Sequence, residues 1–170
     1  ASTGNRKDVR VIGVNVQPDN SLSNTDRIDS GRTVVSVTGA QVSPSFWACP
    51  STPTTMWVAY LDANSHSNSG AEVYAARSTD AGVTWTRWQV DANDGEHYFA
   101  PAIAGSADCS SVTVAWVRET TTNATPTYSY WLYSRTFSAG AWGSIGIRDS
   151  LIGSSSYYMA DPAVVYDNDS

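Results

Sequence analysis

The chain has 170 residues, a formal net charge of −6 and only 15% charged residues, with Lys7 as its single lysine. An acidic chain of this kind is a poor partner for nucleic acid or an anionic membrane surface, so we expect neither. No apolar run approaches the roughly 20 residues of a membrane span. Residues 1–4 lack the charged and apolar regions of a signal peptide, which fits a secreted protein whose leader has been removed.

Composition favours an all-β domain. Aromatic residues make up 11% of the chain, with seven tryptophans and nine tyrosines, and serine and threonine crowd the intervening segments. Two strands are predicted at 9–17 and 32–38, where β-branched residues are frequent.

Two further strand patterns, 70–77 and 84–90, flank a predicted chain reversal. Gly82 can adopt a positive φ there without steric cost. Asp80 can accept hydrogen bonds from backbone N–H groups two or three residues further on, which closes the turn. Trp85 then offers a large apolar face to a neighbouring layer. A stable turn without a catalytic role is the interpretation we favour.

An internal repeat follows from three pairs of matched positions. Pro44 and Pro101 are 57 residues apart, Val58 and Val114 are 56 apart, and Trp85 and Trp142 are 57 apart. The second copy of the turn keeps a glycine and a tryptophan and lacks the aspartate, and a third repeat opens at 161–167. Each unit contains four candidate strands, as a propeller blade does.

One motif carries a family resemblance. Its residues read Ser-x-Asp-x-Gly-x-Thr-Trp, at Ser78, Asp80, Gly82, Thr84 and Trp85. The motif resembles the Asp-box of the sialidase-like (BNR-repeat) β-propellers, in which it is a structural turn facing away from the active site. The resemblance implies a partial β-propeller of four-stranded antiparallel blades, and a small β-sandwich is the alternative.

In that architecture the chain divides into four parts. Residues 1–40 hold two strands of a preceding or closing blade. Residues 41–95 form a blade with the Asp-box, 96–150 a blade with a degenerate Asp-box, and 151–170 the first strand of another blade. Propellers close with about 4–8 blades, so a second chain or a missing segment is expected to complete the ring.

Cys49 and Cys109 lie at similar points of the two repeats, each near the turn between the first and second strands. A disulfide between adjacent blades and two buried thiols are both compatible with this placement. No Cys-x-x-Cys or histidine pairing accompanies them, so no zinc site is predicted.

Ligand binding is expected where each innermost strand begins. These positions precede the proline of each repeat, and sugar hydroxyls and ring faces suit their side chains. The candidate ligand-binding residues are Glu96, His97, Tyr98, Tyr157, Tyr158 and Asp161. Ordinary loop polarity with aromatic packing is the competing interpretation, and the ligand would be a glycan or an extracellular protein.

The resemblance also raises the question of catalysis. Family sialidases hold a carboxylate with three arginines and use a Tyr–Glu nucleophile pair and an aspartate acid/base. None of the arginines here stands in the Arg-Ile-Pro context of many members, so we assign no catalytic residue. A secreted binding module is the function we expect. The alternative is part of a sialidase-like glycoside hydrolase whose catalytic residues are mostly in missing blades.

A weak calcium signal remains. Residues 91–96 resemble a short calcium loop, and 167–169 add oxygen ligands, but the glycine comes one residue too early for an EF-hand. A solvated turn is the interpretation we favour, and no other cofactor is predicted.

Overall fold

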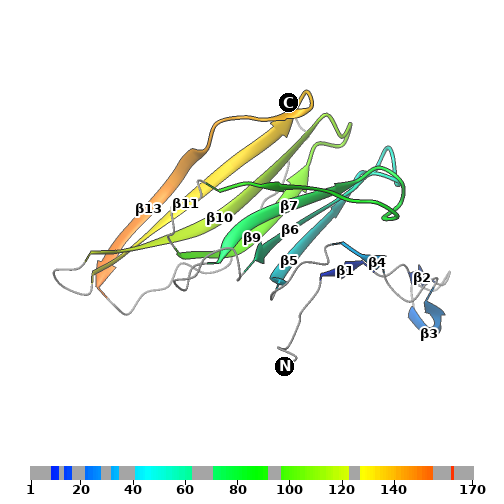
Figure 1. The fold of residues 1–170 in the computed structure, drawn as a ribbon, viewed down its shortest axis with the longest axis horizontal. Helices are drawn as coiled ribbons and strands as arrows, with labels where there is room; N and C mark the ends of the chain where they lie inside the picture. Colours follow the sequence, from blue (N-terminus) through cyan, green and yellow to red (C-terminus); the bar gives the residue numbers. More distant parts are fainter. Residues whose placement is uncertain are drawn as a thin grey trace, which may run out of the picture.

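The computed structural model describes residues 9–11, 14–16, 22–27, 32–34, 41–62, 71–91, 97–122, 127–154 and 162. Every regular element within these ranges is a β-strand, so the all-β class is confirmed. Two sheets dominate the molecule (Figure 1).

The first sheet is an antiparallel meander of four strands in the order β5-β6-β7-β8. Its strands are β5 (Gln41–Ala48), β6 (Met56–Asp62), β7 (Glu72–Ser78) and β8 (Thr86–Gln89). Sequential strands are neighbours throughout, which is the strand order of a propeller blade.

The second sheet repeats this order with one difference. Its strands are β9 (His97–Gly105), β10 (Ser111–Thr122), β11 (Thr127–Ser138), β12 (Ala141–Trp142) and β13 (Gly146–Ser154). Both β12 and β13 pair with β11, so this sheet has five strands where four were predicted. The outer strand is interrupted at 143–145, where the N–H of Gly143 still donates to the Thr136 carbonyl at 2.9 Å.

The N-terminal strands form two small ribbons. Strand β1 (Arg10–Val11) pairs with β4 (Arg32–Thr33), and β2 (Val14–Val16) pairs with β3 (Leu22–Arg27). The third repeat predicted at 161–167 lies outside the described residues, apart from Pro162.

The two large sheets pack face to face around one core, with β9 lying against β5 and β6. At this inner edge the backbones approach closely. The Ser45 hydroxyl accepts a hydrogen bond from the Ile103 N–H at 3.2 Å, and a Cβ on Gly105 would stand 2.6 Å from the Trp47 ring. Toward the outer strands large rings fill the space, namely Trp57, Trp88, Phe137 and Trp142.

The first sheet is covered on both faces. One face packs against the second sheet. On the other, Val58, Tyr60 and Ala76 pack with Val9 and Val34 of the N-terminal segment. A sheet covered on both sides is typical of a blade between two neighbours.

The repeat is also present in the backbone conformation. Ser43 and Ala100, each directly before a proline, have φ values of 51° and 47°. In the turns, Ala81 and Gly82 have φ values of 57° and 81°, and Ala139 and Gly140 have values of 50° and 83°. The degenerate second turn thus has the same left-handed pair of residues as the first, although it lacks the aspartate.

The 78–85 turn is closed by its own side chains. Asp80 accepts hydrogen bonds from the Thr84 hydroxyl at 2.6 Å, from the Thr84 N–H at 2.8 Å and from the Ser78 hydroxyl at 2.8 Å. The Ser78 hydroxyl in turn accepts from the Gly82 N–H at 2.8 Å, and the Trp85 indole donates to the Gly82 carbonyl at 3.1 Å. Hydrogen bonds from Thr84, and then from Ser78, lower the pKa of Asp80 from 3.8 to about 2.

Replacing Asp80 by alanine is expected to lower the melting temperature by several degrees at pH 7. A carboxyl whose pKa is depressed in the folded state contributes stability above its ordinary pKa of 3.8. That contribution is lost as the pH falls toward about 2. Thermal melts between pH 7 and pH 2 should therefore show the difference between Asp80→Ala and the parent shrinking with acid. A difference that is constant with pH would show that the ionised carboxylate does not stabilise the turn.

Candidate functional site

The end of the first sheet where β5 begins carries a buried polar layer. Gln41, Asp62 and Glu72 pair directly across three strands and are each less than 5% exposed. Arg87 on β8 donates to the Asp62 carboxylate at 2.5 Å, and its guanidinium carbon lies 3.5 Å from the centre of the Tyr74 ring. Burial raises the pKa of the nearby Tyr60 hydroxyl. Within this layer Arg87 pairs with Asp62 and the Gln89 amide donates to Glu72, whereas the buried Gln41 amide has no hydrogen-bond partner among the described residues.

Two of the six predicted ligand-binding residues are described. His97 is half-buried and stacks on Phe99, with ring centres 6.5 Å apart. Tyr98 is 3% exposed and belongs to the core between the sheets. These neighbours point to opposite faces of β9, as successive strand residues do. Glu96, Tyr157, Tyr158 and Asp161 lie outside the described residues, so the grouping of the six remains a prediction.

Asp91 is the described residue of the predicted calcium loop. Its carboxylate accepts hydrogen bonds from the Val73 N–H at 2.5 Å and from the Gln89 amide at 2.8 Å. Residues 92–96 are not described. Across the described ranges there is no group of three or more side chains suited to holding a metal ion, and no helix there could cross a membrane.

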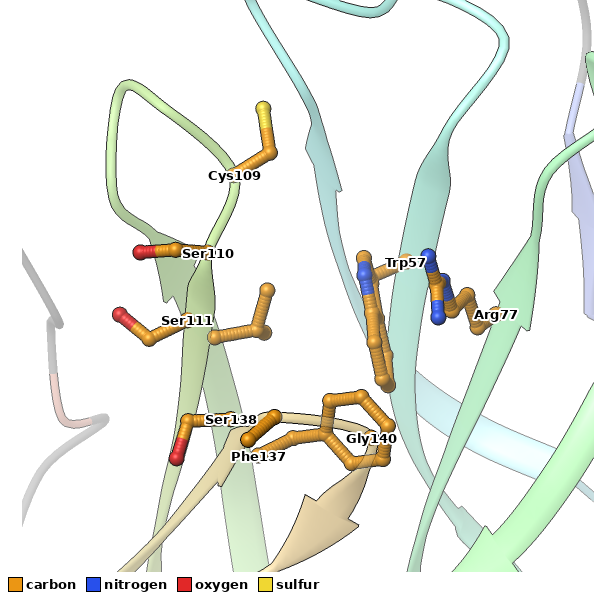
Figure 2. A pocket seen from close by; sticks show the side chains of 10 residues that line it. Trp57, Arg77, Cys109, Ser110, Ser111, Phe137, Ser138 and Gly140 are labelled. Atoms are coloured by element: carbon orange, nitrogen blue, oxygen red, sulfur yellow. The ribbon is translucent and has the colours of Figure 1, made fainter.

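A pocket of about 530 Å³ opens at the opposite end of the sheets, beside the 138–141 turn. Trp57 at the start of β6 and Arg77 at the end of β7 line it from the first sheet. Val112 and Phe137 line it from the second sheet. Figure 2 shows Phe137 below the loop of Cys109. Trp57 and Phe137 pack edge to face with ring centres 5.0 Å apart, so the interior is mainly aromatic.

Arg77 is the charged residue of this pocket. Its guanidinium carbon lies 5.7 Å from the centre of the Trp57 ring and 6.0 Å from that of Phe137. Figure 2 shows the guanidinium beside the indole. Its Nε is buried and has no hydrogen-bond partner among the residues that the structure describes. The pocket therefore combines ring faces with a cation.

Serines and backbone form the rim of the pocket, from the segments 109–111 and 138–140. In Figure 2 the hydroxyls of Ser110 and Ser111 point away from Trp57. The Ser110 hydroxyl donates to Asp108 at 2.8 Å, and the Ser106 hydroxyl, followed by the groups of Ser110, lowers the pKa of Asp108 to about 2. These bonds order the loop that forms one wall.

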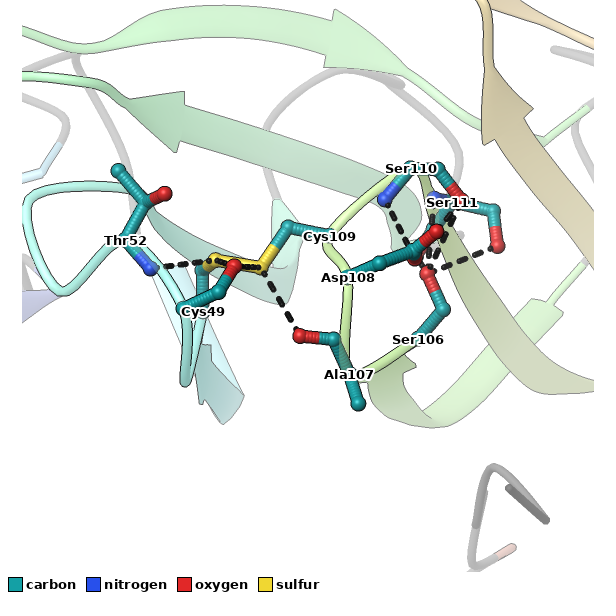
Figure 3. Close-up of a disulfide and its surroundings, with 9 residues drawn as sticks. Cys49, Thr52, Ser106, Ala107, Asp108, Cys109, Ser110 and Ser111 are labelled. Atoms are coloured by element: carbon teal, nitrogen blue, oxygen red, sulfur yellow. Dashed lines mark hydrogen bonds between the residues drawn. A yellow bond between two sulfur atoms is a disulfide. The ribbon is translucent and has the colours of Figure 1, made fainter. Parts of the chain in front are cut away.

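A disulfide between Cys49 and Cys109 ties this loop to the first sheet (Figure 3). The two Cα atoms are 5.7 Å apart, and the bond joins the turn after β5 to the turn after β9. Cys49 is 1% exposed and accepts a hydrogen bond from the Thr52 N–H at 3.1 Å. Because Cys109 lines the pocket, the disulfide fixes the spacing of its walls.

Sequence reasoning did not anticipate Trp57, Arg77 and Phe137 as a site. A signal was present, because Arg77 directly precedes the 78–85 turn and pairs with Trp57 once β6 and β7 are aligned. The contribution of Phe137 depends on how the second sheet packs on the first, which strand patterns do not specify.

In comparisons with known proteins, similarity to this chain is found among solved structures, of which five chains match. No family model matches it, and no curated protein is similar to it. Among solved structures it is similar to a Trypanosoma rangeli sialidase, with 12% sequence identity and a TM-score of 0.42. The match covers 89% of this chain and 26% of the sialidase. The chain therefore spans about a quarter of the length of that protein.

Proposed function

We propose that this chain is part of a secreted Asp-box propeller and acts as a glycan-binding module. Another segment or chain would complete the ring of blades. The observation that carries the proposal is the pocket between the sheets, with the rings of Trp57 and Phe137, the Arg77 guanidinium and a rim of serines and turn backbone.

The chemistry of a sugar fits these groups. Sugar hydroxyls can accept hydrogen bonds from a guanidinium and can pair with turn backbone, and the buried rings of Trp57 and Phe137 form an apolar floor below them. The pocket volume of about 530 Å³ also lies within the range of about 300–1,000 Å³ typical of small-ligand sites. An extracellular protein would need a broader surface than this pocket.

A glycan array probed with the 170-residue chain tests the proposal, since every lining residue is in the chain. We expect at least one oligosaccharide to bind. Ser138→Trp, at the exposed rim, should weaken that binding about tenfold or more, a loss of about 1.4 kcal/mol. Ser150→Trp, an exposed position on β13 that does not line the pocket, is the matched control.

Two outcomes would contradict the proposal. The first is an array without any oligosaccharide bound by a folded chain. The second is a Ser138→Trp variant that binds as tightly as Ser150→Trp, which would place the ligand elsewhere on the molecule.

A further inference from the structure

The two ends of the 49–109 disulfide differ in exposure. Cys49 is 1% exposed and lies in the turn after β5, whereas Cys109 is half-buried and belongs to the rim of the pocket. Thiol–disulfide exchange begins when a thiolate attacks one of the two sulfur atoms, so access decides which sulfur is attacked. An external thiol therefore reaches the Sγ of Cys109 more readily than that of Cys49.

Hydrogen-bond donors lie beside the buried end of the bond (Figure 3). The Thr52 N–H donates to the Sγ of Cys49 at 3.1 Å. The Ser51 hydroxyl lies 3.4 Å from the Sγ of Cys49 and 3.2 Å from that of Cys109, and it is the donor because a disulfide sulfur carries no hydrogen. Hydrogen bonds to a charged group are stronger than those to a neutral one. The two donors therefore favour Cys49 as the sulfur that leaves with negative charge.

The loop that carries Cys109 is also closed by hydrogen bonds of its own. The Cys109 N–H donates to the Ser106 carbonyl at 2.8 Å, and the Ser111 N–H donates to the Ser106 hydroxyl at 3.1 Å. The Asp108 carboxylate accepts from the Ser110 N–H at 3.0 Å and from its hydroxyl at 2.8 Å. These bonds are local to the loop, so they keep Cys109 at the wall of the pocket after its bond to the first sheet opens.

We propose that the 49–109 disulfide is an exchange site for external thiols, with Cys109 as the residue that becomes modified. The incoming thiolate forms a bond to the Sγ of Cys109 as the bond between the two cysteines breaks. The electron pair of the broken bond goes to Cys49, which leaves as a thiolate beside the Thr52 and Ser51 donors and then takes up a proton. The sulfur of the external thiol is oxidised and that of Cys49 is reduced, so the step needs no other reagent. Return attack by Cys49 on the mixed disulfide reverses the modification.

Trapping of the mixed disulfide tests which sulfur is attacked. The folded chain is exposed briefly to glutathione, exchange is stopped with acid, and free thiols are capped with a maleimide. Peptide mass mapping should find glutathione on Cys109 and the maleimide on Cys49. This arrangement should exceed the reverse one about tenfold or more, because access and the leaving group both favour it. Equal amounts of the two arrangements, or glutathione mainly on Cys49, would overturn the proposal.

The rate of disulfide loss tests the role of Ser51 separately. Ser51→Ala removes one donor and should slow the loss about fivefold or more, since a hydrogen bond to a charged group is missing. Ser51→Thr restores the hydroxyl and should return the rate toward that of the parent. Ser144→Ala changes an exposed serine between β12 and β13 and is the matched control.

The outcomes of these experiments do not depend on glycan binding, because no readout involves a sugar. A Ser51→Ala variant that loses its disulfide as fast as Ser144→Ala would overturn the role assigned to the hydroxyl. A folded parent that keeps its disulfide intact, while the same chain in urea is reduced under otherwise equal conditions, would overturn the exchange site itself. Melting curves of each variant establish that the compared proteins are folded.

Discussion

Replacing Trp57 by alanine is expected to lower the free energy of unfolding by about 3–5 kcal/mol, as is typical when a buried tryptophan is truncated. Trp57 is 2% exposed and lies between the two sheets. Its ring centre is 5.0 Å from that of Phe137, 5.7 Å from that of Trp88 and 6.0 Å from that of Trp142. Its removal therefore leaves a cavity among the rings that pack between the two sheets.

Urea unfolding followed by far-UV circular dichroism measures this loss. Trp57→Phe retains a ring at the same position and should lose less. Trp47→Ala removes the same side chain from a half-buried position at the inner edge of the sheets, and should also cost less. If Trp57→Ala stayed within about 1 kcal/mol of the parent, the size of an ordinary substitution, the aromatic cluster would not hold the sheets together.

Local chemistry explains how much of the fold could be predicted. The strands on either side of the 78–85 turn follow from alternating apolar residues, and the reversal follows from Gly82 and the capping capacity of Asp80. The offset of 56–57 residues between matched positions predicts two successive antiparallel sheets of similar order. Each of these features depends on residues close together in sequence or on simple repetition.

Other features depend on contacts that local patterns do not contain. Residues before proline normally avoid helical conformations, so the positive φ of Ser43 and Ala100 was not predictable. The alternation of apolar and polar residues does not predict the interruption between β12 and β13 either. Successive residues of a strand point to opposite faces of its sheet, as His97 and Tyr98 do on β9. A binding site predicted from consecutive residues is therefore divided once those residues form a strand.

The candidate site belongs to this second group. Arg77 and Trp57 come together through the pairing of β6 with β7, and Phe137 joins them only through packing of the second sheet. The sequence likewise did not decide whether Cys49 and Cys109 form a disulfide or remain two thiols. Their separation of 60 residues along the chain does not give the distance between them in the folded protein. Register and sheet packing decide both questions.

Loss of the disulfide is expected to destabilise the chain by about 4 kcal/mol, the loop-entropy value for a cross-link that closes 60 residues. Without the bond the unfolded chain regains the freedom that the cross-link removed, while the folded sheets keep their shared core. Unfolding of the oxidised parent should therefore be compared with that of the reduced parent and of the Cys49→Ala/Cys109→Ala double variant.

The double variant also separates loop entropy from side-chain packing. Cys49 is 1% exposed, so its truncation adds a small packing loss that reduction alone does not cause. Reducing agent should leave the double variant unchanged, and this serves as the control. Because Cys109 lines the pocket, reduction should also weaken binding of the ligand found on the array. A reduced chain that unfolds within about 1 kcal/mol of the oxidised one would show that the 49–109 cross-link restrains the unfolded chain little.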